Sequence, residues 1–191
     1  MRITGGAARS INLLALEHGL LRPATDFLRQ AVFSSLGDTV AGKNFLDLFA
    51  GTGAYGLEAL SRGATGGLFV ERNFSLKSIL QKNINAVSKS LAIDGSCCSI
   101  ALEDCLTFNS QEKFGLIFID PPYDIARNSS NRILANTLNL LWNTVDARII
   151  FEVPSDLPSP VIPGLEEIKR IGKNYKKNSP SALIYAKTLP H

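Results

Sequence analysis

The sequence predicts an α/β fold with a mainly parallel sheet, and three observations support this prediction. Short apolar segments of strand length alternate along the chain with longer segments of helical periodicity. A glycine-rich turn follows one of these strands, and a rigid Asp-Pro-Pro-Tyr corner follows another. Open α/β sheets bind ligands at such turns, beyond the carboxyl ends of their strands. With 191 residues, 45% of them hydrophobic, the chain can bury a full core, and we expect one domain over residues 1–191.

Composition narrows the class of protein. The apolar runs fall short of the roughly 18 residues of a membrane span, and the N-terminus lacks the apolar core of a signal peptide. Cys97, Cys98 and Cys105 are too few and too clustered for a disulfide framework, and they match no zinc spacing. His18 and His191 offer no pair for a metal. We therefore expect a cytoplasmic protein with reduced structural thiols, no membrane span and no metal.

The net charge of +3 is unevenly distributed along the chain. Residues 1–44 carry a net +2, residues 45–163 a net −3 and residues 164–191 a net +4. Basic ends around an acidic middle suit a catalytic body flanked by surfaces that meet a polyanion, although solvated charge near termini is also ordinary.

The first 44 residues are predicted to form a short basic extension and one helix. Residues 1–22 are expected to be strands or loops, with Gly5-Gly6 as a flexible start. Thr25 is predicted to cap a helix that ends near Gly37. Its apolar residues at helical spacing are Phe27, Leu28, Val32, Phe33 and Leu36. On this pattern alone, Arg22, Asp26 and Arg29 are its polar face.

A strand, a glycine turn and a helix follow at the start of the expected core, residues 45–191. Phe45–Phe49 is the strand, and the turn carries glycines at the GxGxxG spacing of dinucleotide folds: Gly51, Gly53 and Gly56. A second strand, Leu68–Glu71, ends in an acid 20 residues after Gly51. A carboxylate at this spacing is typical of residues that bind a ribose.

The remaining elements follow from periodicity and turn residues. We expect a helix over Phe74–Leu91, a strand over Ser99–Leu102 before Glu103 and Asp104, and a strand over Leu116–Ile119. Ser129 and Ser130 are expected to lead into a helix over Asn131–Trp142, followed by a strand over Arg148–Val153 and a proline-rich loop over Pro154–Gly164. A β-hairpin around Lys173–Pro180 is expected to close the fold.

The corner Asp120-Pro121-Pro122-Tyr123 predicts a site for a flat group that bears an amine. The prolines have no N–H and a restricted φ, so they end the strand and hold Asp120 and Tyr123 in one geometry. The Asp120 carboxylate and the Pro121 carbonyl can accept the two amine hydrogens, while Tyr123 stacks on the base. The alternative is an Asp-Pro turn with a core-facing tyrosine, but the position after a buried strand favours the site.

Two enzyme classes fit the glycine turn, and the corner separates them. A nicotinamide dehydrogenase would use the turn and Glu71, but it normally needs a catalytic His, Tyr-Lys or Cys and has no use for the corner. Hydrogen bonds from an aromatic amine to Asp120 and Pro121 would instead pyramidalise the nitrogen and direct its lone pair at an electrophilic methyl group. The corner therefore favours amino methylation.

The chain resembles a known family over most of its length, the bacterial small-subunit ribosomal RNA guanine 2-amino methyltransferases. The residues that carry the resemblance are Gly5-Gly6, Arg9, Leu21–Asp26 with Arg29, Leu46–Ala64, Phe69–Glu71 and Asp120–Tyr123. The arginine-containing N-terminal residues distinguish this family from other amino methyltransferases that share the glycine turn and the corner.

The resemblance implies a Rossmann-like, seven-strand class I fold with S-adenosylmethionine as donor and a 16S rRNA guanine as acceptor. The implied cofactor contacts are Asp47, Gly51 and Gly53 for the methionine part, Glu71 for the ribose and Asp104 for the adenine. The implied RNA or active-site contacts are Arg9, Arg22 and Arg29, and we expect the basic residues Lys173, Lys176 and Lys177 to bind RNA as well. Free 16S rRNA or a small-subunit assembly intermediate would be the partner of a monomeric enzyme.

Two positions depart from the family pattern. Ser10 stands where the family usually has glycine, and Lys173–Pro180 is longer and more basic than the usual closing turn.

The alternative functions are a DNA adenine amino methyltransferase and a non-catalytic module that binds S-adenosylmethionine or RNA. The first usually needs a separate base-reading domain, for which 191 residues leave little room, and the second could lose the corner that this chain keeps.

Overall fold

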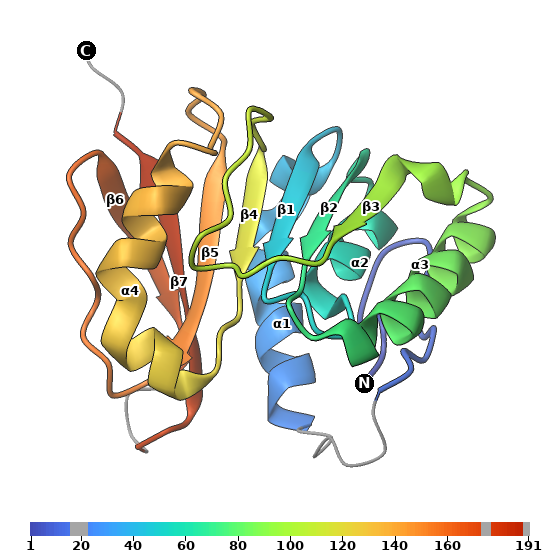
Figure 1. The fold of residues 1–191 in the computed structure, drawn as a ribbon, viewed down its shortest axis with the longest axis horizontal. Helices are drawn as coiled ribbons and strands as arrows, with labels where there is room; N and C mark the ends of the chain where they lie inside the picture. Colours follow the sequence, from blue (N-terminus) through green and yellow to red (C-terminus); the bar gives the residue numbers. More distant parts are fainter. Residues whose placement is uncertain (16–22, 173–176, 189–191) are drawn as a thin grey trace.

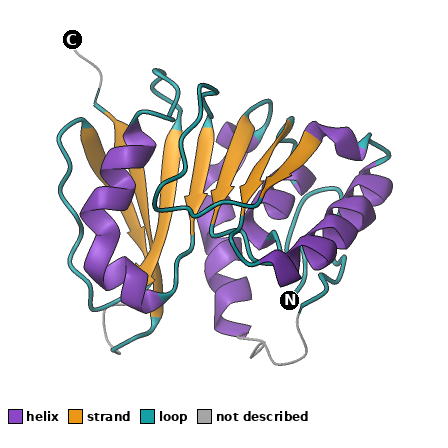
Figure 2. Ribbon diagram, viewed as in Figure 1, coloured by secondary structure: helices purple, strands orange, loops and turns teal. Residues whose placement is uncertain are grey.

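The computed structural model of the chain describes residues 1–15, 23–172 and 177–188. Its centre is a seven-stranded sheet with helices on both faces, as expected for a Rossmann-like methyltransferase fold (Figures 1 and 2). The strands lie in the order β3-β2-β1-β4-β5-β7-β6. They span β1 Asn44–Leu48, β2 Gly66–Val70, β3 Cys98–Ala101, β4 Leu116–Ile119, β5 Arg148–Pro154, β6 Leu165–Ile171 and β7 Pro180–Lys187.

The first five strands are parallel, so their carboxyl ends meet at one edge of the sheet. β7 pairs antiparallel with both β5 and β6, which confirms the expected closing hairpin. The chain proceeds from β1 outward to β3 and then crosses to β4 on the other side of β1. In open α/β sheets this reversal marks the ligand-binding crevice.

The described residues also form four α-helices and three short 3₁₀ segments, of which α1 and η1 precede the first strand. The α-helices are α1 Pro23–Leu36, α2 Ala54–Ser61, α3 Lys77–Leu91 and α4 Tyr123–Leu138, and the 3₁₀ segments are η1 Gly37–Val40, η2 Phe74–Leu76 and η3 Gly95–Cys97. None of the helices within the described ranges is long and apolar enough to cross a membrane.

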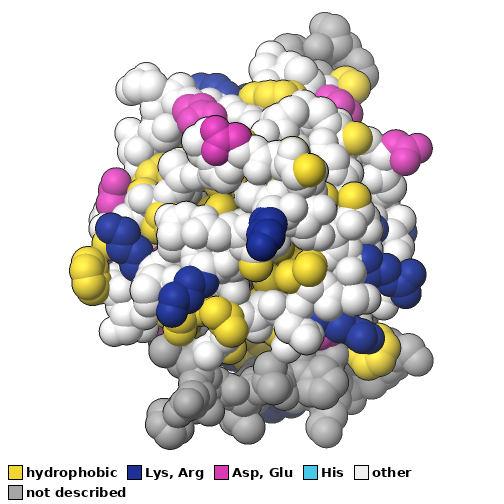
Figure 3. Space-filling model, turned by 90° about the vertical axis from the view of Figure 1, so that its right-hand side faces the viewer, with side chains coloured by type: hydrophobic (Ala, Val, Ile, Leu, Met, Phe, Trp, Pro, Cys, Tyr) yellow, Lys and Arg dark blue, Asp and Glu magenta, His cyan; other side chains and the backbone are white. Residues whose placement is uncertain are grey.

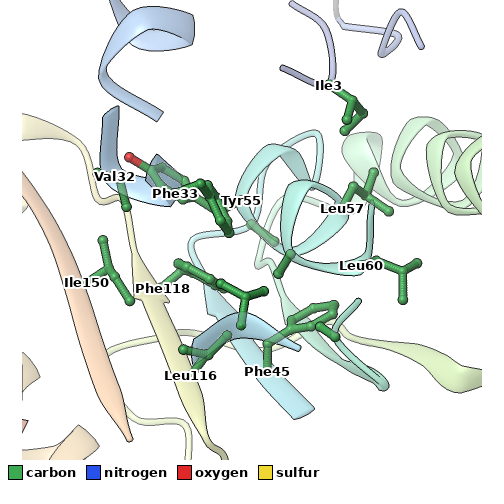
Figure 4. Close-up of a cluster of buried hydrophobic side chains, with 14 of the residues drawn as sticks. Ile3, Val32, Phe33, Phe45, Tyr55, Leu57, Leu60, Leu116, Phe118 and Ile150 are labelled. Atoms are coloured by element: carbon green, nitrogen blue, oxygen red, sulfur yellow. The ribbon is translucent and has the colours of Figure 1, made fainter. Parts of the chain in front are cut away.

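The core consists of two apolar clusters, one on each face of the sheet. The first joins the sheet to α1, α2 and α3, and Figure 4 shows Phe33, Tyr55 and Phe118 close together in it. The second joins the opposite face to α4. All four residues of β4 are buried, as expected for a central strand.

Two helices begin earlier than the sequence predicts. α4 starts at Tyr123 and ends at Leu138, instead of spanning Asn131–Trp142. Pro122 stands at its N-cap, where a missing N–H costs no helical hydrogen bond, so the prolines open the helix as well as ending the strand. α1 likewise starts at Pro23, so Thr25 lies inside its first turn and is not its cap.

Helix α1 buries only part of its predicted apolar stripe. Leu28, Val32, Phe33 and Leu36 are buried, whereas Phe27 is 73% exposed. The polar side of α1 also differs from the prediction, because Arg29 is only 2% exposed. This helix therefore places an arginine in the interior and a phenylalanine on the surface.

Arg29 belongs to a buried network around Glu58 of α2. The Glu58 carboxylate is fully buried and accepts hydrogen bonds from Thr4 N and Thr4 Oγ1, each at 2.7 Å. Arg62 Nε donates to it over 2.9 Å, and Arg29 Nε lies 3.5 Å away. Arg29 also donates to the Arg2 carbonyl over 2.6 Å. The network ties the N-terminal residues to α1 and α2.

Gly5 and Gly6 are tightly packed, which corrects the expectation of a flexible start. A Cβ at Gly6 would lie 2.0 Å from the Ser61 carbonyl oxygen, and one at Gly5 would overlap the Arg62 guanidinium. Ser61 Oγ donates to the Gly5 carbonyl over 2.7 Å. Ser10 adopts a left-handed φ of 74°, so the backbone keeps the conformation that glycine usually provides.

Candidate active site

The candidate site lies at the carboxyl edge of the parallel strands, beside the reversal between β1 and β4 (Figure 1). A cavity of about 520 Å³ opens there, a size typical of small-molecule sites. The described residues that line it are Phe49, Glu71, Arg72, Cys105, Asp120, Pro121, Pro122, Tyr123, Ile125 and Glu152. The structure therefore brings Glu71 and the whole Asp-Pro-Pro-Tyr corner to one cavity, although they are about 50 residues apart in the chain.

The turn after β1 has a backbone conformation that requires glycine. Gly51 and Gly53 have φ values of 55° and 84°. A Cβ at Gly53 would also lie 2.5 Å from Leu80 Cδ1 of α3. Neither glycine is among the described residues that line the cavity, so their clearest role in this structure is to shape the turn that begins α2.

Gly56 and Asp47 lie beneath this turn. A Cβ at Gly56 would meet Phe45 and Phe69 at 2.5 Å, so glycine allows α2 to pack closely on β1 and β2. Asp47 Oδ2 accepts the Gly56 backbone N–H over 2.8 Å, and Asp47 is only 2% exposed. Burial raises the pKa of Asp47 well above its ordinary value, and the Asp120 and Glu71 carboxylates raise it further. Asp47 thus supports the turn from the interior.

Glu71 directly follows β2 and is held by two backbone donors. Gly51 N donates to its Oε2 over 2.9 Å, and Asn73 N donates to its Oε1 over 2.7 Å. Each carboxylate oxygen has a second lone pair, so this arrangement orients the group without exhausting its capacity to accept hydrogen bonds. Two adjacent hydroxyl groups of a ribose would match it.

Asp104 and Cys105 follow β3 and differ in where they lie. Asp104 is half-buried and accepts the Leu106 backbone N–H over 2.9 Å, but it is not among the described residues that line the cavity. Cys105 does line it, and its Sγ accepts the Phe49 N–H over 3.1 Å. Burial raises the pKa of Cys105 to about 12, so its thiol stays neutral at physiological pH.

The Asp-Pro-Pro-Tyr corner turns the chain from β4 into α4. Asp120 is exposed, and its backbone N–H donates to the Leu48 carbonyl of β1 over 3.4 Å. Pro121 is buried and Pro122 caps the helix, so the half-buried Tyr123 is the first residue of α4. A helix that begins at Tyr123 fixes the direction of this ring more firmly than a free turn would.

Glu152 is a cavity residue that the sequence reasoning missed. It lies in β5, is 4% exposed, and accepts the Tyr55 hydroxyl over 2.9 Å. A single acid inside the otherwise apolar run of residues 149–153 was the available signal. The sequence also did not identify Phe49, Arg72, Cys105 and Ile125 as lining residues.

The charge of the cavity wall is predominantly negative. Three carboxylates line it, those of Glu71, Asp120 and Glu152, against the single described basic residue Arg72. An acidic wall in a partly enclosed cavity favours a ligand with positive charge. A sulfonium compound has that charge, and the side chains of Phe49 and Ile125 offer an apolar surface to an aromatic ring.

The predicted RNA contacts fall into three groups. Arg9 and Lys177 are exposed, as such contacts require. Arg29 does not match its prediction, because its guanidinium is buried and bonded to Asp26, Glu58 and Arg2. Arg22, Lys173 and Lys176 lie outside the described residues.

Comparisons with known proteins agree on one family. A family model described as conserved hypothetical protein 95 matches residues 1–179. Ribosomal RNA small subunit methyltransferase D of Escherichia coli is 31% identical over 169 residues, which are 85% of this chain and 79% of that protein. The protein of the same name from Haemophilus influenzae is 29% identical over 164 residues, 83% of this chain and 81% of that protein.

A solved structure described as methyltransferase yhhF from Escherichia coli shares the fold. It superposes with a TM-score of 0.75 at 24% identity, covering 98% of this chain and 97% of that one. At this identity the structural likeness supports the fold alone.

Proposed function

The chain belongs to the family of ribosomal RNA small subunit methyltransferase D and conserved hypothetical protein 95, and on this basis we propose that it methylates the 2-amino group of a guanine in 16S rRNA. The broader class, an S-adenosylmethionine-dependent rRNA methyltransferase, follows from that membership. The observation that carries the finer assignment is the joint position of Asp120, Pro121, Tyr123 and Glu71 around one cavity.

Of the residues expected to hold S-adenosylmethionine, Glu71 lines the cavity and the others lie beside its lining residues. The Glu71 carboxylate, oriented by Gly51 and Asn73, is suited to accept both ribose hydroxyls. The glycine turn follows the lining residue Phe49, and Asp47 supports the turn through the Gly56 N–H. Asp104, expected near the adenine, is placed one residue from the cavity wall at Cys105. When bound, S-adenosylmethionine supplies an electrophilic methyl group.

The corner provides the groups that act on the acceptor. Asp120 and the Pro121 carbonyl accept the two hydrogens of the guanine 2-amino group, which localises the nitrogen lone pair and aims it at the methyl group. Tyr123 stacks on the base and holds it in line, and alignment of this kind can lower a barrier by about 7–11 kcal/mol. The nitrogen gains a methyl group and loses one proton, which the exposed Asp120 carboxylate can pass to solvent.

One face of the molecule carries basic side chains that suit a polyanion. Figure 3 shows Lys and Arg side chains across the middle and lower half of this face, with Asp and Glu side chains mainly in its upper half. Among the described residues, exposed basic side chains occur in the N-terminal residues, at Arg2 and Arg9, and in α3, at Lys77, Lys82 and Lys89. Phosphate contacts from such residues would position RNA without reading its sequence.

Further parts of the proposal concern the setting of the reaction. We place the enzyme in the cytoplasm as a monomer that acts without a metal, with 16S rRNA, free or in a small-subunit assembly intermediate, as its partner. In this proposal the acidic cavity binds the cofactor and the target base, and the basic surface binds the phosphates of the RNA.

Methylation of RNA from a strain that lacks this gene tests the proposal. The purified protein, S-adenosylmethionine and either 16S rRNA or small subunits from that strain should yield N2-methylguanosine by nucleoside mass spectrometry. Asp120→Ala should reduce the single-turnover rate by about 10²–10³, while cofactor affinity stays near wild type. Asp120→Asn should be nearly as slow, because its amide presents a donor where an acceptor is needed.

Two controls sharpen this test. Asp124→Ala removes an exposed carboxylate four residues along, in the first turn of α4, and should keep the wild-type rate. Tyr123→Phe should be mild, whereas Tyr123→Ala should lose about 1–3 kcal/mol of stacking on the base. Methylation of adenine, or a wild-type rate for Asp120→Ala, would contradict the proposal.

A further inference from the structure

Glu152 and Asp120 lie side by side at the carboxyl edge of two neighbouring strands. β4 and β5 are parallel with Ile119 opposite Phe151, so the next residue of each strand is Asp120 and Glu152. Paired residues of neighbouring strands are about 4.8 Å apart and project to the same face of the sheet. Both residues line the same cavity. Two carboxylates therefore face one ligand from adjacent positions.

Tyr55 of α2 orients the Glu152 carboxylate through a hydrogen bond. Its hydroxyl donates to Glu152 Oε2 over 2.9 Å, and its ring stacks on Phe118 at a centroid distance of 5.4 Å and an interplanar angle of 24°. The ring also lies 6.3 Å from the Phe33 ring, in the cluster that Figure 4 shows. Burial raises the pKa of Tyr55 well above its ordinary value, and the negative charge of Glu152 raises it further. The hydroxyl therefore remains a donor, and Glu152 is oriented as an acceptor.

The edge of guanine presents donors at adjacent positions. Its 2-amino group carries two hydrogens and its N1 carries one, whereas the N1 of adenine is an acceptor. Glu152 lies on the strand next to Asp120 and lines the same cavity. A base whose amine is bound by Asp120 and Pro121, and whose N1 edge faces β5, would meet Glu152. A carboxylate at that point would attract the N1–H of guanine and repel the N1 lone pair of adenine.

We propose that Glu152, positioned by Tyr55, accepts the N1–H of the target guanine and so selects guanine over bases that lack this hydrogen. This inference rests on the proposed function and extends it from the reacting amine to the recognition of the base. A site built to accept a hydrogen bond discriminates strongly against analogues that lack the donor, because the complex then forms one hydrogen bond fewer. Glu152 is thus a specificity determinant, and Tyr55 is a positioning residue.

The test compares two RNA fragments that differ in one base. One contains the guanine located by mass spectrometry, and the other carries 2-aminopurine there, which keeps the 2-amino group but has no hydrogen on N1. Wild-type enzyme should methylate the guanine fragment about 10- to 100-fold faster, which is the range for loss of a hydrogen bond to a charged group. Glu152→Gln should reduce this preference to about threefold or less. The carboxylate that accepts the N1–H is then absent, so the further loss of that hydrogen from the base has little additional effect.

Controls separate base reading from folding and from cofactor binding. Glu166→Gln removes an exposed carboxylate of β6 and should keep the wild-type preference. Tyr55→Phe keeps the ring packing but removes the donor, and it should reduce the preference by about 2- to 10-fold without loss of the fold, measured by circular dichroism. Cofactor affinity, measured by calorimetry, should fall only slightly in Glu152→Gln, because Glu71 and Asp120 still line the cavity.

Results other than those expected would contradict either this inference alone or the proposed function as well. An undiminished preference for guanine in Glu152→Gln, or a loss confined to cofactor affinity, would overturn the inference while leaving the proposed function intact. A wild-type protein that methylates no guanine in 16S rRNA or in small subunits from the deletion strain would instead refute the proposed function, and with it this inference.

Discussion

The Gly51 backbone N–H donates to Glu71 Oε2 over 2.9 Å, which joins the glycine turn after β1 to the end of β2. Asn73 N holds the other oxygen over 2.7 Å. Two backbone donors therefore orient the carboxylate, and each of its oxygens keeps a lone pair for a ligand.

Glu71→Ala should weaken S-adenosylmethionine binding by about 1.5–3 kcal/mol, because hydrogen bonds to a charged group are lost. Calorimetry measures this directly. Glu103→Ala, which removes an exposed carboxylate after β3, is the matched control and should bind normally. Wild-type affinity in Glu71→Ala, or binding of NAD in place of S-adenosylmethionine, would contradict the assignment of this cavity.

Asp47→Asn should stabilise the unliganded protein as the pH rises. The pKa of Asp47 is raised mainly by burial, so the folded state binds this proton more tightly than the unfolded chain does. The wild type therefore loses stability as the pH rises from the ordinary aspartate value through the raised one. The variant lacks this loss and can still accept the Gly56 N–H through its amide oxygen.

The stability difference should grow with pH. Below about pH 4 the two proteins should be alike, and near pH 8 the variant should be more stable by about 0.5–2 kcal/mol. Urea unfolding over a pH series measures the difference. Lower stability of Asp47→Asn than of the wild type at the alkaline end would show that the carboxylate is not a buried, costly charge.

Glu58→Ala should destabilise the protein by about 3–5 kcal/mol, because it removes a buried carboxylate beside the buried guanidinium of Arg29 and leaves that guanidinium its ion pair with Asp26. It also removes the acceptor of Thr4 N and Thr4 Oγ1, so the N-terminal residues should become sensitive to protease. Urea unfolding and limited proteolysis measure the two effects. Glu112→Ala, at an exposed site, should change neither.

Ser10→Gly should raise the free energy of unfolding by about 0.5–1 kcal/mol. A left-handed conformation costs a residue other than glycine about 1–2 kcal/mol, and the extra flexibility of glycine in the unfolded chain offsets part of the gain. Ser34→Gly, at an exposed position within α1, should instead lose about 0.5 kcal/mol. Thermal unfolding of the two variants compares them, and destabilisation by Ser10→Gly would rule out strain at this position.

Replacing Arg9, or Lys173, Lys176 and Lys177 together, by alanine should weaken RNA binding across many sequences. Each lost phosphate contact should flatten the slope of log affinity against log salt by about 0.7–0.9, depending on strandedness. Filter binding over a salt series measures the slope. Lys113→Ala, just before β4 at the opposite edge of the sheet, is the control. An unchanged slope would leave the substituted residues as solvated surface.

The sequence by itself determined the parts of the molecule that depend on local patterns. Runs such as Leu116–Ile119 specify buried strands, and Gly51 and Gly53 specify a turn that other residues would strain. The interval from Gly51 to Glu71 and the Asp120–Tyr123 corner predicted which polar groups follow strand ends. The parallel sheet then brought these groups to one cavity, as expected.

Only the tertiary structure decided the features that depend on which element lies beside which. Periodicity placed Arg29 on the polar face of α1. In the folded protein Arg29 is buried, because it lies beside the buried Glu58 carboxylate of α2. Glu152 faces the cavity because β5 pairs with β4 in one register, and no local pattern contains that register. Positions 5 and 6 have room only for glycine, because the C-terminal end of α2 packs against them. Local sequence controls backbone conformation over a few residues, whereas strand order and long-range packing determine what each side chain meets.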